Sequence, residues 1–583
     1  MLASAVKMRP VLLVLVLSAL AAAQVIVVET PMAPPDWALA QRALLRESAE
    51  SAAAFAARYV DGRGHFRAVE RWGGNDGPDD VMETFHNWPL AYALGADELV
   101  LRLYERIWEG HLDQYQRAKA PSAEMARDGM YWREFPAAFD WEHNGEGLAP
   151  FYHFGLCRPR DMLYRQRAVR YAGFYNGDDP LAPNYDKKHR IIRSLHNGSR
   201  GPKLTQATVY DWGGEAEPGM DRHSRYRTAG NIRGDHPLNL CATTLGMTAY
   251  LLTGESKYRD WVLEYAGAWR ERILQNHGNV PTNIGLDGTI GGEWGGKWYG
   301  GVFGWNFDSS TASRNYFMRG IRLGMSNALL LTGDLSYLDP LRRQLDNLYA
   351  VAKRENGRTL LPNKYGDQGW WGYMPARHAD VLRDLYLFSM NPADLSRLDG
   401  DTWIAYLRGS KPGYPAEALT AALAAVGQRV REFRNDPSTP DTRASDHAQA
   451  FNPVITTPLV NLMLGANDPG TAGNLLHARL RYFDPHRRRA GVPEDVGALV
   501  DTLEDRAAFV TLVNLSQTRE REVVVQTGAY AEHLAEQVTV AGRVYPVRAA
   551  HFTVRLAPGA GARLRVGMRR YAHPPTLAQP WDR

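Results

Sequence analysis

A repeated helix–turn–helix pattern is the feature that most constrains how this chain can fold. Residues 251–255 (LLTGE) and 330–334 (LLTGD) share one form, in which an apolar run meets a glycine and then an acidic residue. After each turn, apolar residues recur every three or four positions, as they do along one face of a helix. Residues 79–94, followed by Gly95 and Asp97, repeat this arrangement. Because a single hairpin cannot bury its own apolar face, the sequence predicts an array of packed hairpins.

Weaker copies of the pattern extend the array to six hairpins. The expected turn glycines are Gly95, Gly177, Gly254, Gly333, Gly409 and Gly465. Six hairpins can close into a ring that leaves no exposed end, whereas an open helical solenoid leaves two. We therefore predict a mainly α fold, an (α/α)6 toroid over residues 24–488, with an open solenoid as the alternative.

The composition changes after about Arg489, where short β-branched segments alternate with turn residues. The predicted strands are residues 507–515, 521–527, 536–540, 551–556 and 562–566. Such segments are typical of antiparallel strands. We expect a C-terminal antiparallel sheet or sandwich over residues 489–583.

The N-terminus has the form of an export signal. Lys7 and Arg9 precede an apolar run from Val11 to Ala23, which is short for a membrane span and ends in small residues. Residues 1–23 are therefore predicted to be a cleaved signal peptide, with an uncleaved anchor as the alternative. We expect a secreted or periplasmic protein that does not insert stably into a membrane after cleavage. With 68 basic and 64 acidic residues, the charge balance argues against nucleic acid as a partner.

Aromatic residues gather in glycine-rich segments, which favours a sugar-binding role because aromatic rings can stack on sugar rings. The chain contains 16 Trp and 28 Tyr. The segment 283–308 is expected to be a folded loop that contacts substrate, and 363–373 is expected to form the opposite wall. The residues assigned to these walls are Glu293, Trp294, Lys297, Trp298, Trp305 and Trp371, and Tyr299 in the same loop is a candidate catalytic acid or base. A structural plug is the alternative interpretation of the loop.

Three further segments supply candidate acid, base and carboxylate-binding groups. Residues 139–153 are expected to form an irregular loop that carries Glu142, His143, Glu146 and His153. Residues 231–239 are expected to open a helix, with Asp235 as its N-cap and His236 kept neutral by the helix dipole. Pro89 is expected to break its helix and to expose Asn87. Asn231 and Arg233 are natural partners for a sugar carboxylate. A solvated loop, helix capping and core packing are the structural alternatives.

Together, a signal segment, six helical hairpins, aromatic loops and a C-terminal β domain resemble the (α/α)6-toroid polysaccharide lyases and the related toroid glycoside hydrolases. The resemblance is architectural, and it implies a substrate cleft at one end of the toroid, lined by loops between hairpins. The same toroid carries several chemistries, so the residues must decide among them.

Two reactions and one binding role remain open. β-Elimination from a uronic acid needs Asn, Arg or His at the sugar carboxylate and His or Tyr as base and acid, whereas hydrolysis needs two carboxyl groups astride the bond. The histidine, tyrosine and arginine content of the loops favours a lyase that acts on an acidic polysaccharide, and the alternatives are a hydrolase and a non-catalytic glycan-binding protein. We expect no cofactor, although acidic loops can hold a divalent metal. Cys157 and Cys241 leave one disulfide possible.

Overall fold

The computed structural model describes residues 25–68, 77–117, 126–127, 130–131, 141–180, 184–193, 234–300, 304–305, 317, 319–376, 378–398 and 400–583. The expected signal peptide, Asn231 and Arg233 lie outside these residues. The side chains of Glu142, His143 and Glu293 also lie outside the described part.

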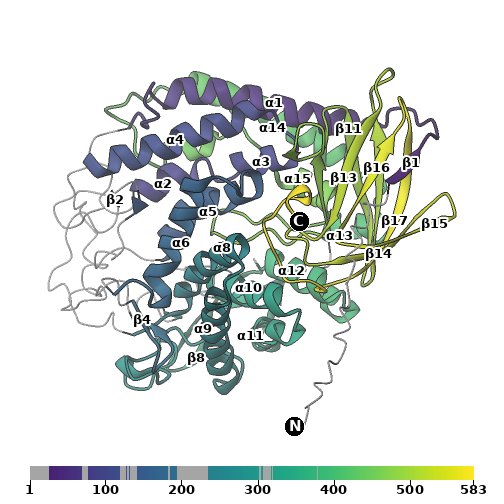
Figure 1. Ribbon diagram of the computed structural model, residues 1–583. Coiled ribbons are helices and arrows are strands. Elements are labelled where there is room, and N and C mark those ends of the chain that lie inside the picture. Colours follow the sequence, from purple (N-terminus) through teal and green to yellow (C-terminus); the bar gives the residue numbers. More distant parts are fainter. Residues whose placement is uncertain are drawn as a thin grey trace, which may run out of the picture.

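Helices dominate the chain up to about residue 464, as expected (Figure 1). They are α1 (Asp36–Tyr59), α2 (Gly77–Glu83), α3 (Trp88–Leu94), α4 (Glu98–Arg117), α5 (Trp141–Cys157), α6 (Met162–Asn176), the 3-10 helix η2 (Pro237–Ala242), α8 (Thr243–Thr253), α9 (Ser256–Gln275), α10 (Arg322–Thr332), α11 (Asp339–Ala350), α12 (Ala379–Ser389), α13 (Thr402–Leu407), α14 (Tyr414–Asn435), α15 (Thr457–Leu459) and the π-helix η8 (Val460–Leu464). Among those described, no helix is long and apolar enough to cross a membrane.

Buried helices alternate with partly exposed ones along the chain. Every residue of α3 is buried, and so is nearly every residue of α8 and α10. The helices that follow them, α4, α9 and α11, carry charged residues on one side. A helix that is apolar on all sides is stable only when other elements surround it. This alternation therefore places α3, α8 and α10 in the interior and their partners outside.

The turn glycines join two helices, as predicted, at four of the six positions. Gly95, Gly254 and Gly333 end α3, α8 and α10 with φ angles of 121°, 73° and 68°, a region that favours glycine, and Gly409, with a φ of 82°, lies between α13 and α14. Gly177 and Gly465 end α6 and η8, but the described residues that follow them directly form no helix, so these two turns were predicted wrongly. The α12 turn is made by Met390, which takes the left-handed conformation itself, so no glycine marks it.

The C-terminal part consists of two five-stranded sheets, as Figure 1 shows at the right of the molecule. One sheet has the order β1-β16-β13-β9-β10 and the other β11-β12-β17-β14-β15. Their strands are β1 (Val25–Val28), β9 (Leu480–Asp484), β10 (Arg489–Ala490), β11 (Val496–Glu504), β12 (Ala507–Asn514), β13 (Arg521–Thr527), β14 (Leu534–Val540), β15 (Arg543–Ala549), β16 (His551–Leu556) and β17 (Gly561–Arg569).

These sheets confirm the antiparallel C-terminal region and add strands that were not predicted. The five expected strands correspond to β12, β13, β14, β16 and β17. The first strand after the helices, β9, begins at Leu480, before the expected boundary at 489. The N-terminal strand β1 also joins, and it pairs with β16 in parallel while the other printed pairs of these sheets are antiparallel.

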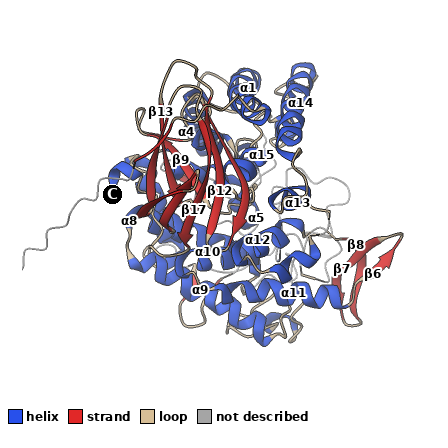
Figure 2. Cartoon of the chain, turned by 90° about the vertical axis from the view of Figure 1, so that its right-hand side faces the viewer, coloured by secondary structure: helices blue, strands red, loops and turns tan. Residues whose placement is uncertain are grey.

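A third, small sheet stands apart from these two. It consists of β6 (Lys353–Glu355), β7 (Arg358–Gly366) and β8 (Gly369–Pro375), which pair in antiparallel order. Figure 2 shows it projecting from the side of the helical part.

The expected irregular loop over residues 139–153 is wrong, because the structure has helix α5 there. Two of its three glycines, Gly145 and Gly155, are required by packing rather than by a turn. A Cβ built on Gly145 would lie 2.9 Å from the carbonyl oxygen of Ala472, and one on Gly155 would lie 2.6 Å from the Tyr164 hydroxyl. The burial of residues 145–157 outweighs the low helix propensity of glycine.

Candidate functional site

An ion pair between Glu146 and Arg319 lies at the start of two buried helices. The carboxylate of Glu146, in the second turn of α5, lies 2.5 Å from the Arg319 guanidinium, just before α10. Both side chains are largely buried, with exposed fractions of 7% and 14%. A buried ion pair carries a desolvation cost, so it needs further hydrogen bonds or a function to be retained.

Sequence reasoning missed Arg319 because no periodic or capping pattern marks it. Its one local signal appears only in the structure, where residues 319–321 have π-helical hydrogen bonding. π-Helical turns are frequent at functional sites.

A close backbone contact brings the start of η2 to the same place. A Cβ built on Gly320 would lie 2.3 Å from the carbonyl oxygen of Pro237. Only glycine allows this approach, and it places the segment of Arg319 against the segment of His236. The backbone segments that carry Arg319 and His236 are therefore neighbours, and Arg319 joins them to Glu146 of α5. The segments of two predicted residues, Glu146 and His236, lie in the same region.

Asp235 lies just before η2 but does not cap it, so the prediction that Asp235 is the N-cap was wrong. The N-cap of η2 is His236. The buried Asp235 carboxylate accepts hydrogen bonds from Asn239 (2.8 Å), Tyr265 (3.0 Å) and the Ile192 amide (3.2 Å). Burial raises the pKa of Asp235 to about 7, and the nearby Arg272 opposes the shift. The Asp235 carboxylate thus holds Asn239, Tyr265 and the Ile192 backbone in place through hydrogen bonds.

His153 is a buried, neutral imidazole on the same helix as Glu146. Its Nδ1 lies 3.0 Å from the carbonyl oxygen of His86, so Nδ1 carries the ring proton. Burial lowers the pKa of His153 to about 4.

The expected exposure of Asn87 is wrong. Pro89 does coincide with a break, since α2 ends at Glu83 and α3 starts at Trp88. Asn87 is nevertheless buried, donates to the Val454 carbonyl oxygen (2.8 Å) and accepts from Asn452 (3.0 Å). Its amide satisfies buried backbone rather than a ligand.

A second polar group, which the sequence did not reveal, joins the next two buried helices. Arg322 donates to Asp384 at 2.6 Å, and Asn467 donates to the other oxygen of the same carboxylate at 2.8 Å. All three side chains are buried.

The two aromatic segments pack on each other, so the prediction that they form opposite walls was wrong. The rings of Trp298 and Tyr365 lie 4.6 Å apart, and Lys297 pairs with Asp367 at 2.8 Å. The Tyr299 hydroxyl also bonds Asp367, and this hydrogen bond raises the pKa of Tyr299.

Within this aromatic cluster the rings differ in exposure. Trp305 is fully buried and donates to the Val280 carbonyl oxygen (2.8 Å), so it belongs to the core and not to a substrate wall. Trp294 and Trp298 are half-buried. Trp371 is 47% exposed, with the Lys364 ammonium 4.7 Å from its ring.

Within the described ranges, no group of three or more His, Cys, Asp or Glu side chains is arranged to hold a metal ion. Cys157 and Cys241 are both buried and are not joined by a disulfide, so the possible disulfide is absent.

A comparison with known protein families gives a match over most of the helical part of the chain. The model of a family described as a domain of unknown function (DUF8034) matches residues 24–226, 215–360 and 399–460. The chain belongs to this family. The DUF8034 match includes Glu146, Asp235, His236 and Arg319, and it ends before the two large C-terminal sheets. No curated protein matches the chain.

Proposed function

We propose that this protein is a carbohydrate-active enzyme that cleaves a uronic-acid-containing polysaccharide by β-elimination. The proposal includes an (α/α)6 toroid with the reaction at one end, export from the cytoplasm and an acidic glycan as substrate. The alternatives that the experiment below distinguishes are a glycoside hydrolase and a non-catalytic glycan-binding protein.

Contacts between consecutive buried helices support the toroid. Helix α3 packs on α5, α5 on η2 and α8, and α8 on α10. The Arg322–Asp384 pair links α10 to α12, and Asn467, which follows η8, donates to Asp384. Asn87, which precedes α3, donates to Val454, which precedes α15. On the outside, α1 packs against both α14 and α4 (Figure 1).

The observation that carries the reaction is the buried Glu146–Arg319 pair beside His236. Elimination requires the sugar carboxylate to be neutralised so that the proton at C5 becomes acidic. A guanidinium binds a carboxylate through two parallel hydrogen bonds and keeps its charge when buried. Glu146 holds Arg319 in one orientation, and Arg319 takes the role that Asn231 and Arg233 had in the sequence-based prediction.

His236 and Tyr299 then divide the proton transfers. A neutral imidazole at the start of η2 takes the C5 proton, as C4=C5 forms and the C4–O4 bond breaks. Tyr299 gives its phenolic proton to the departing oxygen. A phenol is protonated at neutral pH, and the hydrogen bond to Asp367 raises the pKa of Tyr299 further. His153, buried and neutral, positions the start of α3 through His86.

Of the carboxyl groups that were candidates for hydrolysis, the side chains of Glu146 and Asp235 are described, and their contacts favour elimination. A hydrolase needs one carboxyl group to donate a proton and a second one free to act as base or nucleophile. Glu146 is held by Arg319, and Asp235 is held by three protein donors. Both are therefore committed to the protein.

Incubation of the purified protein with uronic-acid polysaccharides, while the ultraviolet absorbance of the unsaturated product is followed, tests the proposal. We expect activity in the wild type and a loss of about 10²-fold in kcat/KM for Arg319→Lys, since one transition-state donor is removed. His236→Ala should lose activity to a similar or greater extent.

The matched control is Arg342→Lys, whose guanidinium pairs with Asp394 at 3.0 Å on the outer helix α11. It should keep wild-type activity. New reducing ends without absorbance would establish hydrolysis instead, and binding with neither product would make the chain a glycan-binding protein.

A further inference from the structure

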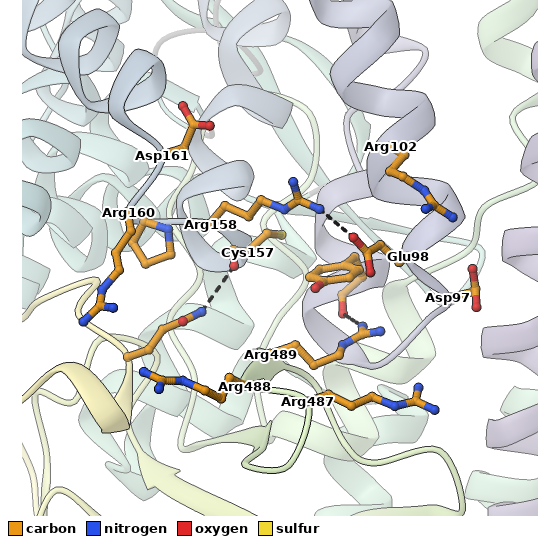
Figure 3. Close-up of a pocket in the computed structure, with 13 residues that line it drawn as sticks. Asp97, Glu98, Arg102, Cys157, Arg158, Arg160, Asp161, Arg487, Arg488 and Arg489 are labelled. Carbon is orange, nitrogen blue, oxygen red and sulfur yellow. Dashed lines mark hydrogen bonds and ion pairs between the residues drawn. The ribbon is translucent and has the colours of Figure 1, made fainter.

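A pocket of about 750 Å³ lies between the helical part and the C-terminal sheets (Figure 3). Its walls are the α3–α4 turn, the α5–α6 turn and the β9–β10 hairpin. It lies at the C-terminal end of α5, where Cys157 is a lining residue, whereas Glu146 is near the N-terminal end. At 1.5 Å per residue, these positions are about 16 Å apart along the helix. The pocket is therefore separate from the proposed reaction site.

Arginine dominates the pocket lining. Six arginines face three carboxylates, and the arginines are Arg102, Arg158, Arg160, Arg487, Arg488 and Arg489. Two of the carboxylates are used at helix starts, since Asp97 accepts from the Leu99 amide and Asp161 from the Tyr164 amide, both at 2.8 Å. The third, Glu98, pairs with Arg158 at 2.8 Å. The lining thus has an excess of positive charge.

The β9–β10 hairpin holds three consecutive arginines at the pocket rim despite their mutual repulsion. Arg489 fastens this hairpin, because it donates to the carbonyl oxygens of Tyr92 (2.9 Å) and Ala96 (2.8 Å) and lies 3.9 Å above the Tyr92 ring. Arg488 has a φ of 47°, an uncommon conformation for a residue with a side chain. Charge repulsion and backbone strain at one turn are the kind of local cost found at binding sites.

The outer arginines keep most of their surface available. The side chains of Arg160, Arg487 and Arg488 are 67%, 60% and 61% exposed. Arg487 pairs with the exposed Glu494 at 3.0 Å, while Arg160 and Arg488 share Asp582. The exposed Arg487–Glu494 pair contributes little, so an anion that accepts two guanidinium hydrogen bonds can replace it, whereas the Asp582 carboxylate is buried.

A second pocket of about 370 Å³ continues the first one. It shares Asp97, Arg487 and Arg489 with it and adds two arginines and three carboxylates, namely Arg42, Arg46, Asp484, Glu494 and Asp495, so arginines still outnumber carboxylates over the two pockets together. The two pockets form one groove, which we call the arginine groove. Its size is in the range of small-molecule sites and leaves room for several linked sugar units.

We propose that the arginine groove binds a polyanionic ligand of at least disaccharide size that carries carboxylate or sulfate groups. Both groups accept paired hydrogen bonds from guanidinium, and the starts of α4 and α6 at the groove add a positive end dipole. This inference does not depend on the reaction proposed above. The groove binds its ligand whether the other end of the helices performs elimination, hydrolysis or neither.

Titration calorimetry of the full chain with three probes tests the inference. Trigalacturonic acid represents carboxylates, a disulfated disaccharide represents sulfates, and maltotriose is the uncharged control of similar size. We expect binding of at least one anionic probe, no binding of maltotriose, and a Kd that rises as salt is added. The probe that binds identifies which anionic group the groove accepts.

The double variant R102Q/R487Q should weaken that binding at least tenfold, because both guanidiniums line the groove and Arg487 lines both pockets. The control R506Q/R543Q removes the same charge from exposed positions of the C-terminal sheets and should bind as the wild type does. Absence of binding by both anionic probes, or equal weakening by the two double variants, would overturn the inference. The readout is heat of binding, so its outcome is independent of any catalytic result.

Discussion

Asp235 shows how one buried carboxyl group can tie the stability of the molecule to pH. Its pKa rises from 3.8 in the unfolded chain to about 7 in the folded protein, mainly through burial. Between about pH 4 and pH 7, the folded state therefore holds a proton that the unfolded state releases. The contribution of Asp235 to the free energy of unfolding falls as the pH rises through this range. The upper limit of the effect is about 4 kcal/mol.

Asp235→Asn should remove this pH dependence. Urea unfolding of the wild type and the variant from pH 4 to pH 8 measures it. Because an amide does not ionise, we expect the free energy of unfolding of the variant, relative to that of the wild type, to increase as the pH rises. Two curves that stay parallel over this range would show that Asp235 does not titrate there.

Single residues were predicted from the sequence where local chemistry marks them. Glu146 and His236 were recognised by residue type within unusual segments, and the structure brings their segments together. Arg319, Asp384 and Asn467 were missed, because each is an ordinary polar residue that no local pattern marks. Their contacts depend on how helices that are distant in the sequence pack together, and the local spacing of residues does not indicate that packing.

At the scale of elements, the start of α10 is fixed by one glycine. Gly320→Ala should destabilise the fold by about 1–3 kcal/mol, since its Cβ would meet the backbone oxygen of Pro237, which a rotamer change cannot move. Gly267→Ala in α9 is the control, because nothing lies within 4 Å of a Cβ built there. It should stabilise α9 by about 0.5–1 kcal/mol. Thermal unfolding compares the two, and an equal effect would exclude the proposed close contact.

Elements were predictable where apolar periodicity and turn glycines agree, as at α8–α9 and α10–α11. They were not predictable where packing overrides local preference. Helix α5 forms although it contains Gly145, Pro150 and Gly155. Its neighbours leave room only for glycine at the two contact points, and the burial of the helix outweighs the low helix propensity of glycine. Strand β9 was missed because its residues are buried against the helices, which hides the alternation of an exposed strand.

For the whole molecule, the helical part and the sheets share one core. Gln41 of α1 donates to the Ala498 carbonyl oxygen (2.9 Å) and accepts from its amide (3.0 Å). Arg479 donates to Leu387 at 2.8 Å, and Arg481 donates to Leu156. Polar groups of the sheets are thus satisfied only when the helices are present.

We therefore expect the two parts to unfold together. Calorimetry should show a single transition, and Gln41→Leu should shift the whole transition downward by about 1–3 kcal/mol, since it leaves buried backbone groups unpaired. Two resolved transitions, of which only one moves in the variant, would show that the parts are independent domains.

The pairing of β1 with β16 has a consequence for the order in which the chain folds. Val25 lies beside Thr553, so β1 is held by a strand that is made only after the helical part of the chain. The parallel partner cannot be met until almost all of the helices have been made, and a contact so distant in sequence forms late. Until then the edge of β16 is an open template for other strands, which is the form in which newly made chains aggregate. Pairing of β1 closes that edge, so this sheet is completed by a strand that is made before all of its other strands.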